Sequence, residues 1–138
     1  MGMVDALVET HRVLAPGGTL VDARPESRVP AYVERRKTRG FQRFGLVKTS
    51  RMELANDRTS DRAIASVVRD GLFKRGRRGR FWHLVDFNSL SALRDYLREH
   101  QRFVHRADWI VDRETRKRHS NDRFAIRRPV RFELLEAQ

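Results

Sequence analysis

The residues Pro16-Gly17-Gly18 separate two segments of different periodicity and so constrain how the chain begins to fold. Apolar side chains recur at helical spacing over residues 4–14, which predicts an amphipathic helix. Proline blocks continuation of that helix, and glycine supplies the positive φ that a sharp exit needs. Residues 19–23 form a short apolar and β-branched run, which predicts a buried strand. The chain is therefore expected to start as a helix, a tight turn and a strand.

The rest of the chain is predicted to consist of short strands and helices. A hairpin is expected over residues 29–50, with residues 37–40 as its turn, and Pro30 favours an edge position for its first arm. The remaining elements, in chain order, are a helix at 60–74 capped by Thr59 or Ser60, a basic loop with glycines at 74–80, a strand at 81–87 buried on both faces, a helix at 90–100 capped by Ser89, a helix at 106–118 and a strand at 123–135. This order predicts a single α/β or α+β domain over 1–138.

The last predicted strand has an apolar face and a charged face. The apolar positions are Phe124, Ile126, Val130, Phe132 and Leu134, and the charged positions are Arg123, Arg127, Arg131 and Glu133. Arg128 is the one charge in the apolar register, and the adjacent Pro129 indicates a bulge or an edge.

Composition excludes several classes of site. The chain has no cysteine, which rules out disulfides, thiolate catalysis and cysteine-ligated zinc or iron–sulfur sites. No apolar run approaches the roughly 18 to 20 residues that span a bilayer, and the first residues lack a signal pattern. These features predict a soluble cytoplasmic protein with no membrane partner.

The net charge of +12 makes an anionic partner a natural candidate, since such a surface attracts polyanions. Two groups of basic residues are the candidate anion-binding sites: Arg35, Arg36, Lys37, Arg39 and Arg43 in the hairpin, and Arg75, Arg77, Arg78 and Arg80 in the loop. Phe41 and Phe44 are interleaved with the first group, and aromatic rings among arginines can stack on bases. The alternative interpretation is that the rings pack inward and the arginines form a solvated surface.

No catalytic or metal-binding residue is predicted. The five histidines, His11, His83, His100, His105 and His119, form neither an HxH nor an HExxH pattern. Asp86 precedes Asn88 and Ser89, where turn or capping chemistry is the expected role of such residues.

Residues 6–25, ALVETHRVLAPGGTLVDARP, resemble a helix–turn–strand segment late in the core of class I S-adenosylmethionine-dependent methyltransferases. The resemblance rests on Arg12-Val13-Leu14 followed by Pro-Gly-Gly and an apolar strand, while Ala15 stands where a basic residue is usual. It implies a partial Rossmann-like sheet with mixed strands, in which a helix and then an antiparallel strand pair follow. Residues 60–74, 80–87 and 123–135 would supply these parts, with 29–50 as an inserted basic hairpin and 89–118 as a connection.

The resemblance also implies that the cofactor-binding half of the family's fold is absent. That half carries a glycine-rich loop after its first strand, and this chain has no G-x-G-x-x-G pattern. We therefore expect neither S-adenosylmethionine binding nor catalysis by this chain alone.

A partial sheet of this kind would leave the edge of the 19–23 strand and the apolar stripe of the first helix open. Either a homo-oligomer, such as a homodimer, or an N-terminal half is expected to cover them. Three hypotheses thus stay open: a non-catalytic methyltransferase-like partial domain that forms assemblies, a small basic nucleic-acid-binding protein, and the C-terminal half of an active methyltransferase that uses S-adenosylmethionine once an upstream segment or partner chain completes it.

Overall fold

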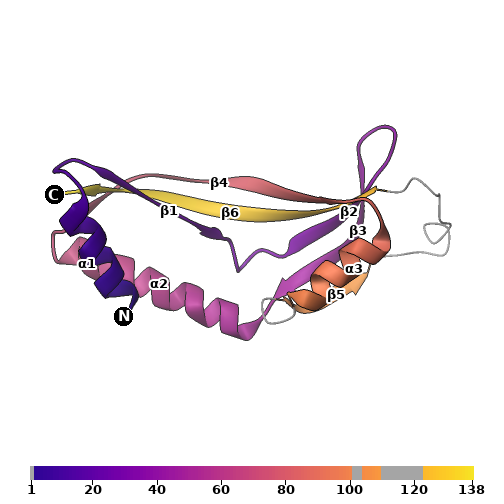
Figure 1. Ribbon diagram of the computed structural model, residues 1–138, viewed down its shortest axis with the longest axis horizontal. Helices are drawn as coiled ribbons and strands as arrows, with labels where there is room; N and C mark the ends of the chain where they lie inside the picture. Colours follow the sequence, from indigo (N-terminus) through magenta and orange to yellow (C-terminus); the bar gives the residue numbers. More distant parts are fainter. Residues whose placement is uncertain (1, 101–103, 110–122) are drawn as a thin grey trace. The chain divides into compact units, whose positions relative to one another are not determined.

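Three helices and six strands form the described part of the chain, which comprises residues 2–100, 104–109 and 123–138 of a computed structural model (Figure 1). In chain order the elements are α1 (Met3–Val13), β1 (Thr19–Pro25), β2 (Ala31–Arg36), β3 (Phe41–Thr49), α2 (Arg51–Arg69), β4 (Phe73–Phe87), α3 (Leu90–Glu99), β5 (Val104–Trp109) and β6 (Arg123–Ala137). The strands form one hydrogen-bonded sheet in the order β1-β6-β2-β3-β5, and β4 also pairs with β6.

The sheet is antiparallel. The pairs β1–β6, β2–β3, β2–β6 and β3–β5 all run antiparallel. The mixed α/β class agrees with the prediction, but the mixed strand directions expected of a Rossmann-like sheet are not found. One physical reason lies in the connection between β2 and β3, since a turn of residues 37–40 can join only antiparallel neighbours.

The chain divides into two compact units, each of which has its own core. Unit 1 contains Met1–Pro25, Ala55–Phe81 and Val130–Gln138, and unit 2 contains Glu26–Leu54 and Trp82–Pro129. The strand β6 belongs to both units and changes its neighbour along its length. It pairs with β2 up to Arg127 and with β1 from Val130, so Pro129, which has no N–H, lies where neither pairing continues.

In unit 1, α1 and α2 lie on the same side of β1 (Figure 1). The core between these elements contains Leu7, Ala63, Ile64, Val67, Phe73, Leu135 and Ala137. Because the helices cover one face of β1, the other face is open, and Val21 there is 57% exposed. The prediction that this strand is buried on both faces is therefore wrong.

The turn between α1 and β1 agrees with the prediction. Gly17 has a φ of 76°, in the left-handed region that favours glycine. Its N–H donates to the carbonyl of Ala137 at 2.9 Å, and the N–H of Ala137 donates to the carbonyl of Gly18 at 2.8 Å. A Cβ at Gly18 would lie 2.8 Å from the carbonyl oxygen of Ala15, so this position has no room for a side chain. The turn thereby joins the start of β1 to the end of β6.

Ion pairs connect β1, β6 and α2 inside unit 1. Arg24 donates to Asp22 at 2.9 Å, to Asp57 at 3.1 Å and to Asp61 at 2.9 Å. Arg131 donates to Asp57 at 2.6 Å and to Asp61 at 2.8 Å. Arg131 thus shares the helix-facing side of β6 with buried Leu135. In unit 1 the alternating face that carries Arg131 and Glu133 therefore faces the helices, because acidic residues of α2 meet Arg131 there.

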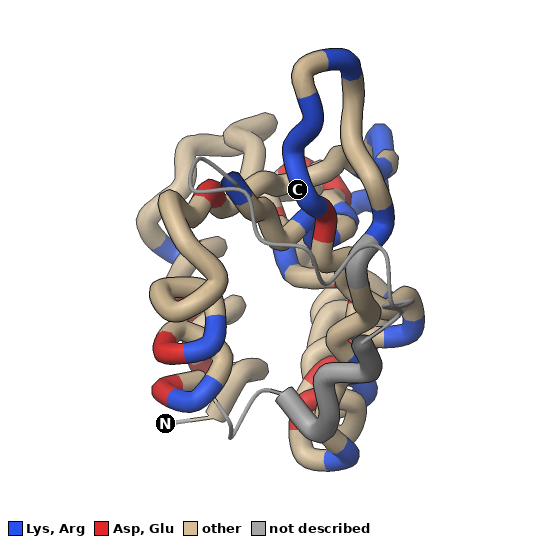
Figure 2. Tube along the Cα trace, turned by 90° about the vertical axis from the view of Figure 1, so that its right-hand side faces the viewer, with Lys and Arg blue, Asp and Glu red and all other residues tan. Residues whose placement is uncertain are grey.

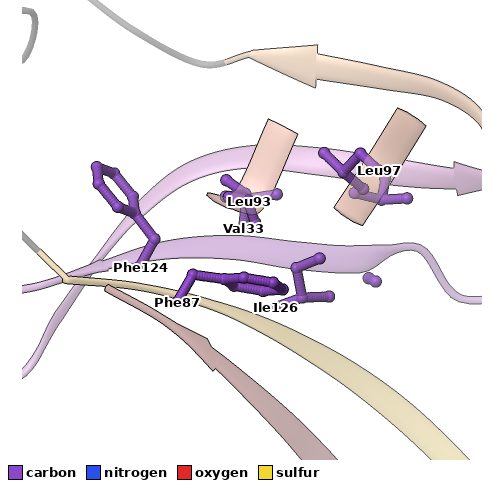
Figure 3. Close-up of a cluster of buried hydrophobic side chains, with 8 residues drawn as sticks. Val33, Phe87, Leu93, Leu97, Phe124 and Ile126 are labelled. Atoms are coloured by element: carbon purple, nitrogen blue, oxygen red, sulfur yellow. The ribbon is translucent and has the colours of Figure 1, made fainter. Parts of the chain in front are cut away.

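Unit 2 is built from β2, β3, β5, α3 and the adjoining parts of β4 and β6. Leu93 and Leu97 of α3 pack against the strands, in a buried cluster that includes Val33, Phe87 and Ile126 (Figure 3). The cap of α3 agrees with the prediction, since the Ser89 hydroxyl accepts from the N–H of Ala92 at 3.1 Å. This cluster occupies one face of the β2–β3 hairpin, and the opposite face bears the candidate site.

Several predicted elements differ from the structure. The helix predicted at 60–74 is α2, which begins at Arg51 and ends at Arg69, and Ser50 rather than Thr59 or Ser60 accepts from its first turn. The first half of α2 is mostly polar, so it has no apolar stripe from which its true start could be predicted. The predicted loop at 74–80 is part of β4, whose backbone pairs with β6. Pro30 does not mark an edge, because β2 pairs with both β3 and β6.

The helix predicted at 106–118 is also partly wrong. Residues 106–109 belong to the strand β5, which pairs with β3. The rest of that prediction, residues 110–118, lies outside the described residues. No helix in the part of the chain that the structure describes combines the length and apolar character needed to cross a membrane. The cytoplasmic location stays a prediction.

Candidate nucleic-acid interface

The face of β2 that points away from the core of unit 2 is polar and aromatic. Ala31, Val33 and Arg35 are buried, while the intervening Tyr32 and Glu34 and the following Arg36 belong to the opposite face. In the ladder with β6, Tyr32 lies opposite Arg127 and Arg36 lies opposite Arg123. Residues that lie opposite one another share a face of the sheet, so β6 adds two arginines to this face.

A β-bulge brings residues of β3 onto the same face. The register between β2 and β3 shifts between Val33 and Glu34, so that Arg43 lies opposite Glu34 and Phe41 lies opposite Arg36. The extra residue in β3 reverses the alternation of side chains beyond it. Without this bulge, Arg43 and Phe41 would fall on the face that carries Val33. The bulge therefore assembles the site.

Arg43 and Trp82 both contact the ring of Tyr32. The guanidinium carbon of Arg43 lies 3.8 Å from the centroid of the Tyr32 ring, a close cation–π contact. The ring centroids of Tyr32 and Trp82 are 5.7 Å apart, with the planes tilted by 32°. Trp82 comes from β4 and is 41% exposed. Three strands thus contribute to one continuous cluster of an arginine and two aromatic rings.

A second cluster surrounds Phe41. The guanidinium carbons of Arg36 and Arg127 lie 5.5 Å and 5.2 Å from the centroid of its ring. Phe41 is nevertheless 45% exposed, so it does not pack inward as the alternative interpretation of the sequence required. We call the two clusters together the aromatic–arginine face, which consists of Tyr32, Arg36, Phe41, Arg43, Trp82 and Arg127.

Two carboxylates partly neutralise this face. Arg127 donates to Glu34 at 3.1 Å, and Arg36 lies 3.5 Å from a carboxylate oxygen of Asp86. Asp86 lies inside β4 and forms an ion pair on this face, instead of the turn or capping contact that was predicted for it. Within the described residues, no carboxylate pairs with Arg43. Its charge is the most available one on the face for an incoming anion.

The turn of the β2–β3 hairpin adds further positive charge. In this turn the N–H of Lys37 donates to the carbonyl of Gly40 at 3.1 Å, and Gly40 has a φ of 80°. Lys37 and Arg39 are exposed. Figure 2 shows basic residues following one another along this hairpin. Of the predicted hairpin residues in this group, Arg35 is buried at 7% exposure and already has an interaction within the protein, so it is not available to a ligand.

The second predicted group lies on β4 in unit 1 and has a different environment. Arg75 forms an ion pair with Glu133 at 2.6 Å, whereas Arg77 and Arg78 are exposed, and Arg80 is exposed but has a partner. The glycines among them lie within the strand β4 and not in a loop, so the predicted loop at 74–80 is not there to surround an anion. A Cβ at Gly79 would lie 2.8 Å from the Phe132 ring, so this glycine allows β4 to approach β6 closely.

Three residues of the site were not predicted from the sequence to belong to it: Tyr32, Trp82 and Arg127. Strict alternation in β2 was a signal that could have placed Tyr32 on the face of the sheet that does not carry Val33. Trp82 was taken as part of a strand buried on both faces, yet Phe81, Trp82 and Leu84 are all exposed. Trp82 contacts Tyr32, which lies 50 residues earlier in the sequence, because β4 and β2 both pair with β6, and periodicity cannot show such long-range pairing.

Two of the described histidines, His11 and His100, make contacts within the fold. A ring nitrogen of His11 lies 3.1 Å from the carbonyl oxygen of Gln138, and the ring of His100 stacks on Tyr96 at 4.1 Å. His83 is exposed. The side chain of His105 and all of His119 lie outside what the structure describes, as does the side chain of Phe44. No group of three potential metal ligands occurs among the described residues.

Comparisons with known proteins add no assignment: no protein-family model, no curated protein and no solved structure matches this chain.

Proposed function

We propose that this protein binds nucleic acid through the aromatic–arginine face of unit 2. The observation that carries the proposal is the contact of Tyr32 with both Arg43, at 3.8 Å, and Trp82, at 5.7 Å, on an exposed sheet surface. Aromatic rings stack on bases, and guanidinium groups bind phosphates or stack on bases themselves. A face that presents both groups side by side suits a ligand with flat rings on an anionic backbone.

The charge of the chain supports the same proposal. A net charge of +12 raises the local concentration of a polyanion and speeds its encounter with the protein. The exposed Lys37 and Arg39 of the hairpin turn extend the positive surface beyond the sheet. A purely solvated arginine surface would not require Phe41 and Trp82 to remain exposed in the midst of these charges.

Replacing Arg43 by alanine tests this proposal. We expect Arg43→Ala to weaken binding of a labelled oligonucleotide about fivefold at low salt and to reduce the slope of log K against log salt by roughly 0.7, since one phosphate contact is lost. Fluorescence anisotropy over a salt series measures both quantities. The control is Arg62→Ala, which removes the same charge from the exposed side of α2. Equal effects of the two substitutions, or no binding at low salt, would refute the proposal.

A second candidate function follows from unit 1. It contains a helix, the Pro-Gly-Gly turn, a strand, a second helix and then β4 and β6, which pair with each other. This order supports the proposal that unit 1 is a partial domain related to class I methyltransferases, without S-adenosylmethionine binding on its own. Among the described strands β1 pairs with β6 alone, so one of its edges is free to pair with a second copy of the chain.

We expect the purified chain to be a homodimer, because pairing of two β1 edges would satisfy the backbone groups of this edge and place the exposed Val21 beside a strand of the second copy. Light scattering should give about twice the mass of the 16.3 kDa chain. Val21→Asp, at an exposed position, should give a monomer with unchanged circular dichroism. A monomer at high concentration would contradict the assembly, and calorimetric binding of S-adenosylmethionine by the chain alone would contradict the partial-domain proposal.

A further inference from the structure

We infer that the ligand of the aromatic–arginine face is single-stranded nucleic acid, with an unpaired base stacked on Trp82. This inference rests on the proposed nucleic-acid binding and names the class of ligand for that site. Trp82 is the largest ring of the face, is 41% exposed and comes from the described strand β4. Its one ring contact among the described residues is with Tyr32.

The cation–π contacts of the other two rings explain why Trp82 is the ring on which a base stacks. The guanidinium of Arg43 lies over the Tyr32 ring, 3.8 Å from its centroid, and so covers a face on which a base could stack. The guanidinium groups of Arg36 and Arg127 lie beside the Phe41 ring in the same way. No guanidinium lies over Trp82 within the part of the chain that the structure describes. A base that stacks on the indole therefore displaces no existing cation–π contact, and Arg43 remains nearby to bind a phosphate.

The geometry of a sheet face favours an unpaired base over a duplex. In a duplex both surfaces of every base are covered by its neighbours, so a ring on a flat sheet meets only the backbone or the groove edges. Stacking on Trp82 requires a base that is already unpaired or that is unpaired at a cost of a few kcal/mol. Lys37 and Arg39, in contrast, can bind the phosphates of either form. Trp82 is thus expected to discriminate between single strand and duplex.

The experiment uses tryptophan fluorescence. The chain contains two tryptophans, Trp82 and Trp109, so Trp109→Phe leaves Trp82 as the only tryptophan. A single-stranded DNA of about 12 nucleotides, within the site sizes known for such proteins, and the duplex of the same sequence are titrated at one salt concentration. We expect the single strand to bind on the order of tenfold more tightly and to quench Trp82, and the duplex to leave its emission nearly unchanged.

Substitutions at Trp82 separate stacking from charge. We expect Trp82→Ala, in the otherwise unaltered chain, to lower affinity for the single strand on the order of tenfold and to leave duplex affinity unchanged. Trp82→Phe should restore most of the lost affinity, because it keeps a ring at the site. Competition of unlabelled duplex against labelled single strand on the unaltered chain measures the same preference if Trp109→Phe does not fold.

The outcomes distinguish this inference from the proposed function. Equal affinity for the two forms, or an equal loss of both in Trp82→Ala, would overturn the single-strand inference and leave nucleic-acid binding intact. Absence of binding to either form at low salt would overturn both.

Discussion

Replacing Phe73 by alanine is expected to lower the free energy of unfolding by about 4 kcal/mol, because it empties the centre of the core of unit 1. Phe73 is 1% exposed and packs in the cluster that contains Ile64, Val67 and Leu135. Its ring also meets His11 edge-on, with the centroids 5.4 Å apart. Urea unfolding followed by circular dichroism measures the change.

Phe81→Ala is the matched control, since it removes the same side chain from the same strand. Phe81 is 47% exposed, so we expect it to cost less than about 1 kcal/mol. A domain of this size has roughly 5 to 15 kcal/mol of stability, so the Phe73 variant should unfold at a clearly lower urea concentration. Similar losses for the two variants would show that the core of unit 1 is not where the structure places it.

Replacing Arg131 by methionine is expected to lower the free energy of unfolding by about 2 to 3 kcal/mol near neutral pH. The substitution keeps most of the side-chain volume but removes the ion pairs of Arg131 with Asp57 and Asp61. The ion pairs of these two carboxylates with Arg24 remain. The cost is below that of a fully buried pair because Arg131 retains 28% of its side-chain exposure. Arg12→Met is the control, because its pair with Glu9 is exposed and worth little.

The cost of Arg131→Met is expected to depend on pH. Burial is the largest single influence and raises the pKa of the Asp61 carboxyl, but the hydrogen bonds and positive charges of Arg131 and Arg24 together lower it by more, so this pKa lies below its ordinary value. A carboxyl with a lowered pKa contributes stability that is fully present above about pH 4 and is lost as the pH falls further. The difference between Arg131→Met and the unaltered protein should therefore shrink between about pH 5 and about pH 2. A difference that stays constant over this range would contradict the role of the ion pairs.

The candidate site could be predicted from the sequence only in part. The basic hairpin and the position of Phe41 within it follow from composition and from alternation around the turn at residues 37–40. The arrangement of Arg43 over Tyr32 depends on a bulge in β3, and the contact of Trp82 with Tyr32 depends on the long-range arrangement of β4 and β2. Trp82 comes from β4, which among the described strands pairs with β6 and not with β2. The bulge and the pairing of β4 with β6 are both properties of strand pairing, which local periodicity does not specify.

Local chemistry alone determined the elements whose signals lie within a few residues. The Pro-Gly-Gly turn, the β2–β3 hairpin, the Ser89 cap and the long last strand were all predicted, because backbone preference and capping act over short distances. Alternation correctly placed Phe124 and Ile126 on the buried face of β6 in unit 2, but tertiary structure decided which face of the same strand is inside in unit 1. The last strand illustrates this point: a helix carrying Asp57 and Asp61 packs over Arg131, so charged residues of β6 face the interior of unit 1. Whether a strand residue is buried depends on which helix or strand packs over its face of the sheet, and that element comes from a distant part of the chain.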